Sequence, residues 1–154
     1  RGRFCGKAES SMPHEPARIE DTKAWLTKAW RDLQAGQFEL VNPALLGDVV
    51  FHAQQAAEKA LKAFLTWHDI PFRKTHNIEE IGAAGIEIDA SLSEAVNRAA
   101  PLTEYAWRFR YPGEPEEPAV DEATEALSLA REIYQAVLAR LPEEAQPRDR
   151  PAGG

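Results

Sequence analysis

The chain has 154 residues, of which 44% are hydrophobic and 28% are charged, as expected for one globular domain with a modest core. Its formal net charge of −7 excludes a general nucleic-acid coat, which needs a positive surface, but it is compatible with a local basic pocket. The single cysteine, Cys5, excludes an intrachain disulfide and a cysteine metal cluster, and no apolar run approaches the roughly 20 residues that cross a bilayer.

The beginning of the chain does not resemble a domain core. The segment RGRFCGKAESS has two arginines and a lysine but no apolar core for a signal peptide, so a cytoplasmic protein is expected. The only methionine is Met12, and two explanations stay open: it is the natural start, or the N-terminus is processed or fragmentary. Residues 1–17 are predicted to be disordered or non-native, and the domain is predicted to start at residue 18.

Helical periodicity dominates the first half of the chain, and no strand is predicted. The first helix is predicted from about Glu20 to Phe38, where small and apolar residues recur at helical spacing. The second is predicted from Pro43 or Leu45 to His68, with Asn42 as a plausible cap. Its apolar residues step alternately by four and three, a heptad seam with alanine in its middle: Leu46, Val50, Ala53, Ala57, Ala60, Phe64 and Trp67.

A short third helix is predicted over residues 77–85, where NIEEIGAAG combines helical spacing with two glycines. Glycine is common just past the end of a helix because it adopts the left-handed conformation at little cost. The helix is therefore expected to end at Gly82 or Gly85.

A fourth helix is predicted from Ser91 or Ser93 to just before Pro112. Pro101 lies inside this segment and lacks a backbone N–H, so a kink or a break is expected there. Arginines and aromatic residues alternate near its end, in LTEYAWRFRYP.

The last predicted helix covers about residues 121–141, and residues 142–154 are expected to form a disordered tail because they contain three prolines and few apolar groups. The predicted fold is therefore all-α, an up-and-down helical bundle of four long helices plus one short helix.

Four polar residues lie on one side of the second predicted helix, beside the alanine seam: Gln55, Glu58, Lys59 and Lys62. Glu58 and Lys62 form an i,i+4 pair in the favourable order, which is typical of a solvated face. A charged flank is also typical of a helix at a dimer interface. The pattern alone leaves these readings and a ligand site open.

His76 follows two cations in RKTHN and precedes the predicted short helix. A histidine in such a position can bind an anion or act as a general acid or base, and it can equally cap or pack locally. The spacing of the histidines does not fit a metal site, so no metal is predicted.

The segment LTEYAWRFRYP predicts a helical face on which Tyr105 and Phe109 flank Arg108, with Arg110 about half a turn away. Such a face can hold a phosphate while a ring stacks on a base. The alternative is aromatic packing at a helix end, with the arginine stems covering the rings.

These segments together resemble the HEPN domain, a helical family named for nucleotide binding in higher eukaryotes and prokaryotes. The resemblance rests on FHAQQAAEKALKAFLTWHDIPFRKTHNIEEI followed by LTEYAWRFRYP, and on WLTKAWRDLQAG in the first helix, where Asp32 takes the place of a recurrent acid. It covers about residues 18–141 and points to the prokaryotic branch that carries Arg-Tyr-Pro.

The resemblance implies a helical bundle that forms a homodimer. It also implies a partner, a minimal nucleotidyltransferase encoded alongside, the two forming a toxin–antitoxin-like module. Many members are metal-independent RNases whose signature is an arginine followed, after four to six intervening residues, by a histidine. This chain lacks that signature, because His76 is its last histidine and precedes Arg98, Arg108 and Arg110.

The family motif assigns roles to individual residues of this chain. The residues expected at a ligand site are Gln55, Lys59, Lys62, His76, Arg110 and Tyr111. Asp32 and Glu58 are expected to neutralise lysines inside the bundle. The favoured function is a homodimeric nucleotide- or RNA-binding module without a cofactor. The alternatives are an RNase with an atypical active site, with His76 and Arg110 as its candidate residues, and a purely structural subunit.

Overall fold

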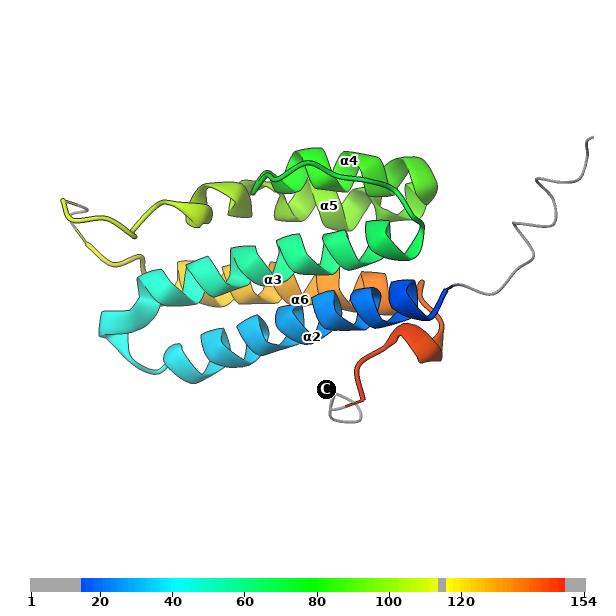
Figure 1. The fold of residues 1–154 in the computed structure, drawn as a ribbon. Helices are drawn as coiled ribbons and strands as arrows, with labels where there is room; N and C mark the ends of the chain where they lie inside the picture. Colours follow the sequence, from blue (N-terminus) through cyan, green and yellow to red (C-terminus); the bar gives the residue numbers. More distant parts are fainter. Residues whose placement is uncertain (1–14, 114–115, 149–154) are drawn as a thin grey trace, which may run out of the picture.

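The computed structural model describes residues 15–113 and 116–148, and this part of the chain contains helices and turns but no β-strand. Five α-helices, labelled in Figure 1, are joined by turns and short 3-10 helices. Their bounds are Pro16–Glu39 for α2, Leu46–Trp67 for α3, Ile78–Ile88 for α4, Ser93–Ala99 for α5 and Val120–Leu138 for α6. The predicted all-α bundle is thus confirmed.

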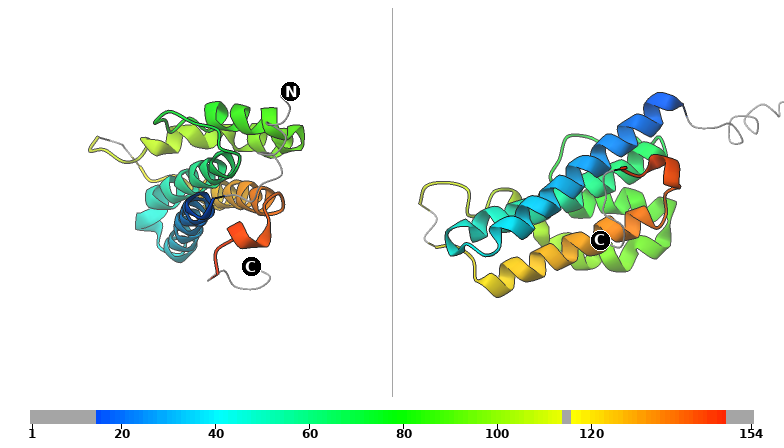
Figure 2. Two further views of the ribbon diagram at one scale, coloured as in Figure 1. Left: turned by 45° about the vertical axis from the view of Figure 1, so that its right-hand side comes forward. Right: turned by 90° about the horizontal axis from the view of Figure 1, so that it is seen from below.

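Helix α3 is central in the bundle. It packs against α2 and α6 on one side and against α4 on the other, while α5 packs against α4 and α6. Figures 1 and 2 show α2, α3 and α6 side by side, with α4 and α5 as a second layer over α3. After α3, residues 69–77 run back along it, so α4 begins beside the middle of α3.

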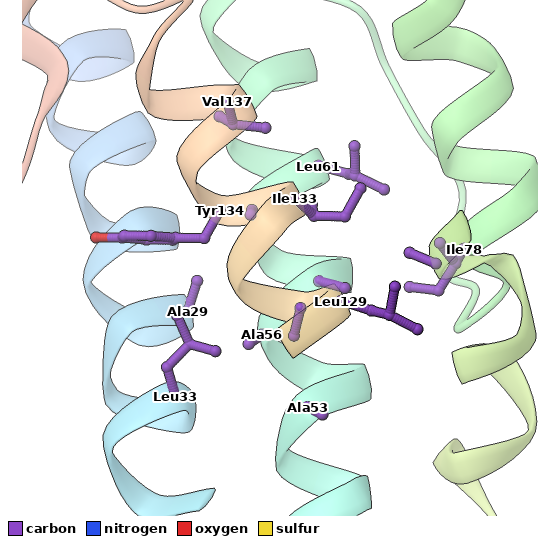
Figure 3. Packing of buried hydrophobic residues seen from close by; sticks show 14 of the residues in the cluster. Ala29, Leu33, Ala53, Ala56, Leu61, Ile78, Leu129, Ile133, Tyr134 and Val137 are labelled. Carbon is purple, nitrogen blue, oxygen red and sulfur yellow. The ribbon is translucent and has the colours of Figure 1, made fainter. Parts of the chain in front are cut away.

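Small residues on α3 explain why three helices approach it so closely. Ala53 and Ala56 are fully buried, and larger side chains from the neighbouring helices fill the space beside them. Figure 3 shows Tyr134 of α6 directed toward α2, where its ring stacks on Trp30, while Ile133 lies on the other side of α6, nearer Leu61 and Ile78. The alanine seam predicted for this helix is therefore its contact surface.

The start of α3 follows the sequence pattern closely. A 3-10 turn, Pro43–Leu45, precedes it, and Asn42 accepts a hydrogen bond from the Ala44 N–H at 3.0 Å. Helix α2 instead begins at Pro16, four residues before the predicted start at Glu20, with a proline in the first turn where its missing N–H costs nothing.

Helix α4 continues to Ile88, so the prediction that it ends at Gly82 or Gly85 was wrong. Both glycines are buried within the helix, where they allow close packing rather than a left-handed turn. A Cβ at Gly82 would lie 2.3 Å from Cγ1 of Val96 in α5, so only glycine fits this contact.

The predicted fourth helix is interrupted at the expected place, beside Pro101. Helix α5 ends at Ala99, and a 3-10 helix, Ala100–Ala106, follows. The helix does not reach Phe109, whose positive φ of 68° turns the chain. The expectation of a helix that continues to just before Pro112 was therefore wrong, although the Tyr105 and Phe109 rings still stack with centroids 6.4 Å apart and Cζ of Arg108 lies 4.7 Å from the Phe109 ring centroid.

The C-terminal segment differs from the expected disordered tail over residues 142–148. Helix α6 ends at Leu138, and a 3-10 turn, Glu143–Ala145, brings Ala145 into the core. Gln146 donates hydrogen bonds to the carbonyls of Leu138 and Leu141 at 3.2 and 3.1 Å, which satisfies acceptors left open by the helix end. The predictions for residues 1–14 and 149–154 lie outside the described residues.

A membrane-spanning helix would need a long, apolar run, and none of the described helices has one.

Candidate functional site

A buried carboxylate, Glu58 of α3, organises the polar residues on one face of the helix. Its side chain is 5% exposed, and its Oε2 accepts a hydrogen bond from Nζ of Lys62 at 2.7 Å. Its Oε1 accepts from Nε2 of Gln54 at 2.9 Å and from the His76 ring at 3.0 Å. Burial alone would raise the pKa of Glu58, but the hydrogen bonds from Lys62, His76 and Gln54 lower it below its usual range. The carboxylate is therefore ionised near neutral pH.

The side chain of Lys62 is directed into the protein interior. Its amine lies 5.5 Å from the Trp25 ring and 5.6 Å from the Phe72 ring, and these two rings meet edge to face. The side chain is only 9% exposed. The structure thus places Lys62, predicted at the ligand site, as the counterion of Glu58 between two aromatic rings.

Lys59 belongs to a second network, between α2 and α3. Its amine lies 2.7 Å from Oδ2 of Asp32, and Oδ1 of Asp32 lies 3.0 Å from Nδ1 of His52. On its other side, Nε2 of His52 lies 3.6 Å from Glu39. Asp32 therefore forms an ion pair with Lys59, and Glu58 forms one with Lys62.

His52 is a network residue that sequence reasoning did not select. The spacing contained a usable signal, because His52 lies seven residues before Lys59 and so shares its side of the helix. The hydrogen bond to Asp32 raises the pKa of His52, burial opposes this, and the charges of Glu39, Asp32 and Asp48 add to the increase.

The raised pKa of His52 predicts a pH-dependent link between α2 and α3. Its stabilising contribution is fully present below the unfolded pKa of about 6.5 and is lost as pH rises through the higher folded pKa. We expect the melting temperature of the wild type to exceed that of His52→Gln by more at pH 6 than at pH 8.5. Thermal melts of both chains check this, and an equal difference at the two pH values would contradict it.

His76 lies on the segment that runs back along α3. Hydrogen bonds anchor its own backbone carbonyl and the next residue, Asn77. Nε2 of Gln54 donates to the His76 carbonyl at 3.0 Å, and the Asn77 side chain caps α4 by accepting from the Glu80 N–H at 3.1 Å. The His76 side chain is 65% exposed, although its Nδ1 meets the buried Glu58. An exposed imidazole is thus held by a buried carboxylate.

Arg110 lies on the turn after the 3-10 helix, with Cζ 3.5 Å from the centroid of the Phe51 ring. Within residues 15–113 and 116–148, no carboxylate lies at ion-pair distance from Arg110. Arg108, in contrast, pairs with Glu104 at 2.6 Å. Of these two arginines, Arg110 at the motif position is the one without a carboxylate partner among the described residues.

The turn that carries Arg110 is tied to the bundle at two further points. The Gly47 N–H, at the start of α3, donates to Oε1 of Glu117 at 2.6 Å. The Tyr105 hydroxyl donates to Glu122 of α6. The first contact ties the chain after the turn to α3, and the second ties the 3-10 helix before the turn to α6.

The predicted site residues thus divide into three groups. Gln55, Glu58, Lys62 and His76 lie together, with Nε2 of Gln55 2.7 Å from Oε1 of Gln54. Arg110 lies over Phe51, which is one helical turn, or about 6 Å, before Gln55 on the same face. Lys59 is directed toward α2, and Tyr111 is 66% exposed on the turn. No cluster of metal-binding side chains is present in the described ranges.

Comparison with known proteins gives a consistent assignment. The model of the HEPN domain matches residues 22–141 of this chain. The crystal structure of an archaeal HEPN homologue is similar, with a TM-score of 0.64 and 24% sequence identity, over 77% of this chain and 96% of that one. At this identity the likeness shows a shared fold. A comparison with curated proteins gave no match.

Proposed function

The chain belongs to the HEPN domain family, and from this premise we propose that it binds the phosphate of a nucleotide or of an RNA end. The observation that carries the proposal is the position of Arg110 over Phe51, with no carboxylate partner among the described residues. A guanidinium whose face rests on a ring keeps its N–H groups for bidentate bonds to phosphate. In a chain with a net charge of −7, an arginine without a carboxylate partner favours an external anion. We place the chain in the branch of the family that carries Arg110-Tyr111-Pro112.

His76 supplies the second contact in this proposal. Its ring is largely exposed and lies over the same face of α3, at Glu58, seven residues beyond Phe51. Seven residues correspond to about 10 Å along a helix. Arg110 and His76 thus flank Gln55, a spacing that suits a phosphate at one end and a sugar or a base at the other.

We also propose that the chain forms a homodimer and pairs with a minimal nucleotidyltransferase in a toxin–antitoxin-like module, as its family resemblance implies. Large apolar side chains support an interface: Phe38 and Val41 are 83% and 86% exposed, and Trp107 and Tyr111 are 52% and 66% exposed. Phe38 and Val41 lie at the end of α2 and just after it, and Trp107 and Tyr111 lie in the turn after the 3-10 helix; both segments are at the same end of the bundle (Figure 1). Clustered apolar exposure of this kind marks protein interaction sites.

Replacing Arg110 with alanine is expected to weaken binding of ATP and of a short 5′-phosphorylated RNA about tenfold or more. The reason is the loss of charge-assisted hydrogen bonds to the phosphate. Isothermal titration of each ligand into the wild type and the variant measures this, and the two ligands distinguish a nucleotide site from an RNA site.

Arg108→Ala is the matched control, because Glu104 already holds its guanidinium. We expect its affinity to stay within about twofold of the wild type, as for a paired surface residue. Negligible binding by the wild type, or equal binding by wild type and Arg110→Ala, overturns the proposal and favours a purely structural subunit.

The contact between Glu58 and His76 favours a second function, metal-independent RNA cleavage. A histidine held by a carboxylate can take a proton from a 2′-hydroxyl, and Arg110 can stabilise the phosphorane. Titrating the RNA in the presence of EDTA and then checking whether it is intact separates binding from cleavage. Intact RNA supports a binding module, whereas cleavage that is lost in His76→Ala supports the RNase.

A further inference from the structure

We propose that Glu58 is a positioning residue for His76: it holds the ring proton on Nδ1 and so presents Nε2 to the ligand. The identity of the ligand rests on the proposed function. The position of the proton does not, and it can be measured on the chain alone.

The direction of the hydrogen bond follows from the state of the carboxylate. Oε1 of Glu58 lies 3.0 Å from Nδ1 of His76, while Oε2 lies 2.7 Å from the charged amine of Lys62. An ionised carboxylate can only accept hydrogen bonds. Nδ1 must therefore carry the proton, whether the ring is neutral or charged.

Gln54 fixes the position of His76 relative to Glu58. Its Nε2 lies 2.9 Å from Oε1 of Glu58 and 3.0 Å from the His76 carbonyl, so one amide group contacts both residues. The next residues along the chain are also fixed, since the Ile78 N–H donates to Thr103 at 3.0 Å. The ring is thus held by the backbone as well as by the carboxylate.

The consequence concerns the nitrogen that faces outward. With Nδ1 engaged and most of the ring exposed, Nε2 is the nitrogen left for a ligand. When the ring is charged, Nε2 donates to a phosphate oxygen, and when it is neutral, Nε2 accepts a proton from a hydroxyl. Glu58 therefore selects which atom of His76 acts, although it does not touch the ligand itself.

The first experiment determines the tautomer in the wild type. Long-range ¹H–¹⁵N correlation spectra of ¹⁵N-labelled protein distinguish the two ring nitrogens of each of the four histidines. His76 is assigned by the loss of its signals in His76→Gln. At a pH where the ring is neutral we expect the proton on Nδ1, and a proton on Nε2 overturns the inference without the need for any Glu58 variant.

The second experiment tests whether Glu58 acts on the ligand through His76. AMP binding is measured for wild type, Glu58→Gln, His76→Ala and the double variant, with circular dichroism to verify folding. We expect Glu58→Gln to weaken AMP binding about tenfold in the wild-type background and less than about twofold in the His76→Ala background, as for directly coupled residues.

Equal losses in both backgrounds would show a merely structural role and overturn the inference. Glu132→Gln, which alters an exposed carboxylate paired with Arg98, serves as the control and should leave AMP binding unchanged. If the wild type binds none of AMP, ATP and the 5′-phosphorylated RNA but carries its proton on Nδ1, the proposed function fails, and the assignment of the proton is supported. The two failures are thus distinguishable.

Discussion

Glu58→Ala is expected to lower the free energy of unfolding by about 3 kcal/mol, the cost of leaving a buried charge without its partner. Glu58 and Lys62 are 5% and 9% exposed, and the amine of Lys62 lies between two aromatic rings. In the variant this amine keeps its desolvation cost but loses its counterion. Gln54 and His76 lose an acceptor at the same time. Urea unfolding of the wild type and the variant measures the difference.

The Glu58–Lys62 pair as a whole is expected to contribute little to the free energy of unfolding, although removing one partner alone is costly. Replacing both residues, Glu58→Leu with Lys62→Met, should recover most of the lost stability, because neither charge then remains buried. Glu132→Ala removes a partner from the exposed pair with Arg98 and should leave the urea midpoint unchanged. A loss of less than about 1 kcal/mol in Glu58→Ala would mean that Lys62 reaches water when unpaired.

Gly82→Ala is expected to lower the free energy of unfolding by about 1 to 2 kcal/mol, although alanine is the better helix former by about 1 kcal/mol. The added Cβ would lie 2.3 Å from Cγ1 and 3.1 Å from Cγ2 of Val96. Val96 is 2% exposed and β-branched, so it cannot rotate away easily. Helices α4 and α5 would have to separate, as thermal or urea unfolding would report.

Gly85→Ala is the matched control in the same helix. Its added Cβ would make ordinary contacts, the nearest at 3.5 Å from Leu92, so the propensity gain should remain and stabilise the chain by up to about 1 kcal/mol. Gly82→Ala combined with Val96→Ala should lose less than the sum of the two single changes. If Gly82→Ala stabilised the chain as much as Gly85→Ala does, the close packing of α4 on α5 would be refuted.

The site shows how one helical face can serve two different networks. Gln55, Glu58, Lys59 and Lys62 share a side of α3 by spacing alone, as the sequence predicts. The tertiary neighbours then separate them, because α2 offers Asp32 to Lys59, while the segment after α3 offers His76 to Glu58. Lys59 as a ligand-binding residue stays a prediction, with its amine bonded to Asp32 in this structure.

The aromatic and arginine-rich segment shows a limit of helical spacing. The spacing predicted Arg108 on one face with Tyr105 and Phe109, and Arg110 on another. The helix ends before Phe109, so the turn decides the outcome: Arg108 pairs with Glu104, and Arg110 lies over Phe51 of α3. Only the family motif pointed to Arg110 as the proposed phosphate contact.

The sequence by itself determined the all-α class, the approximate helix positions, the break at Pro101 and the family. These features depend on periodicity and on backbone chemistry that act within a few residues. Only the tertiary structure decided that Gly82 is a packing residue, that Lys62 is enclosed and that Arg110 has no carboxylate partner among the described residues. The reason is that these properties arise from contacts between distant segments, such as Asp32 with Lys59 or Gly47 with Glu117. A residue's spacing tells which side of its helix it occupies, but the neighbour that covers that side is set by the packing of the whole chain.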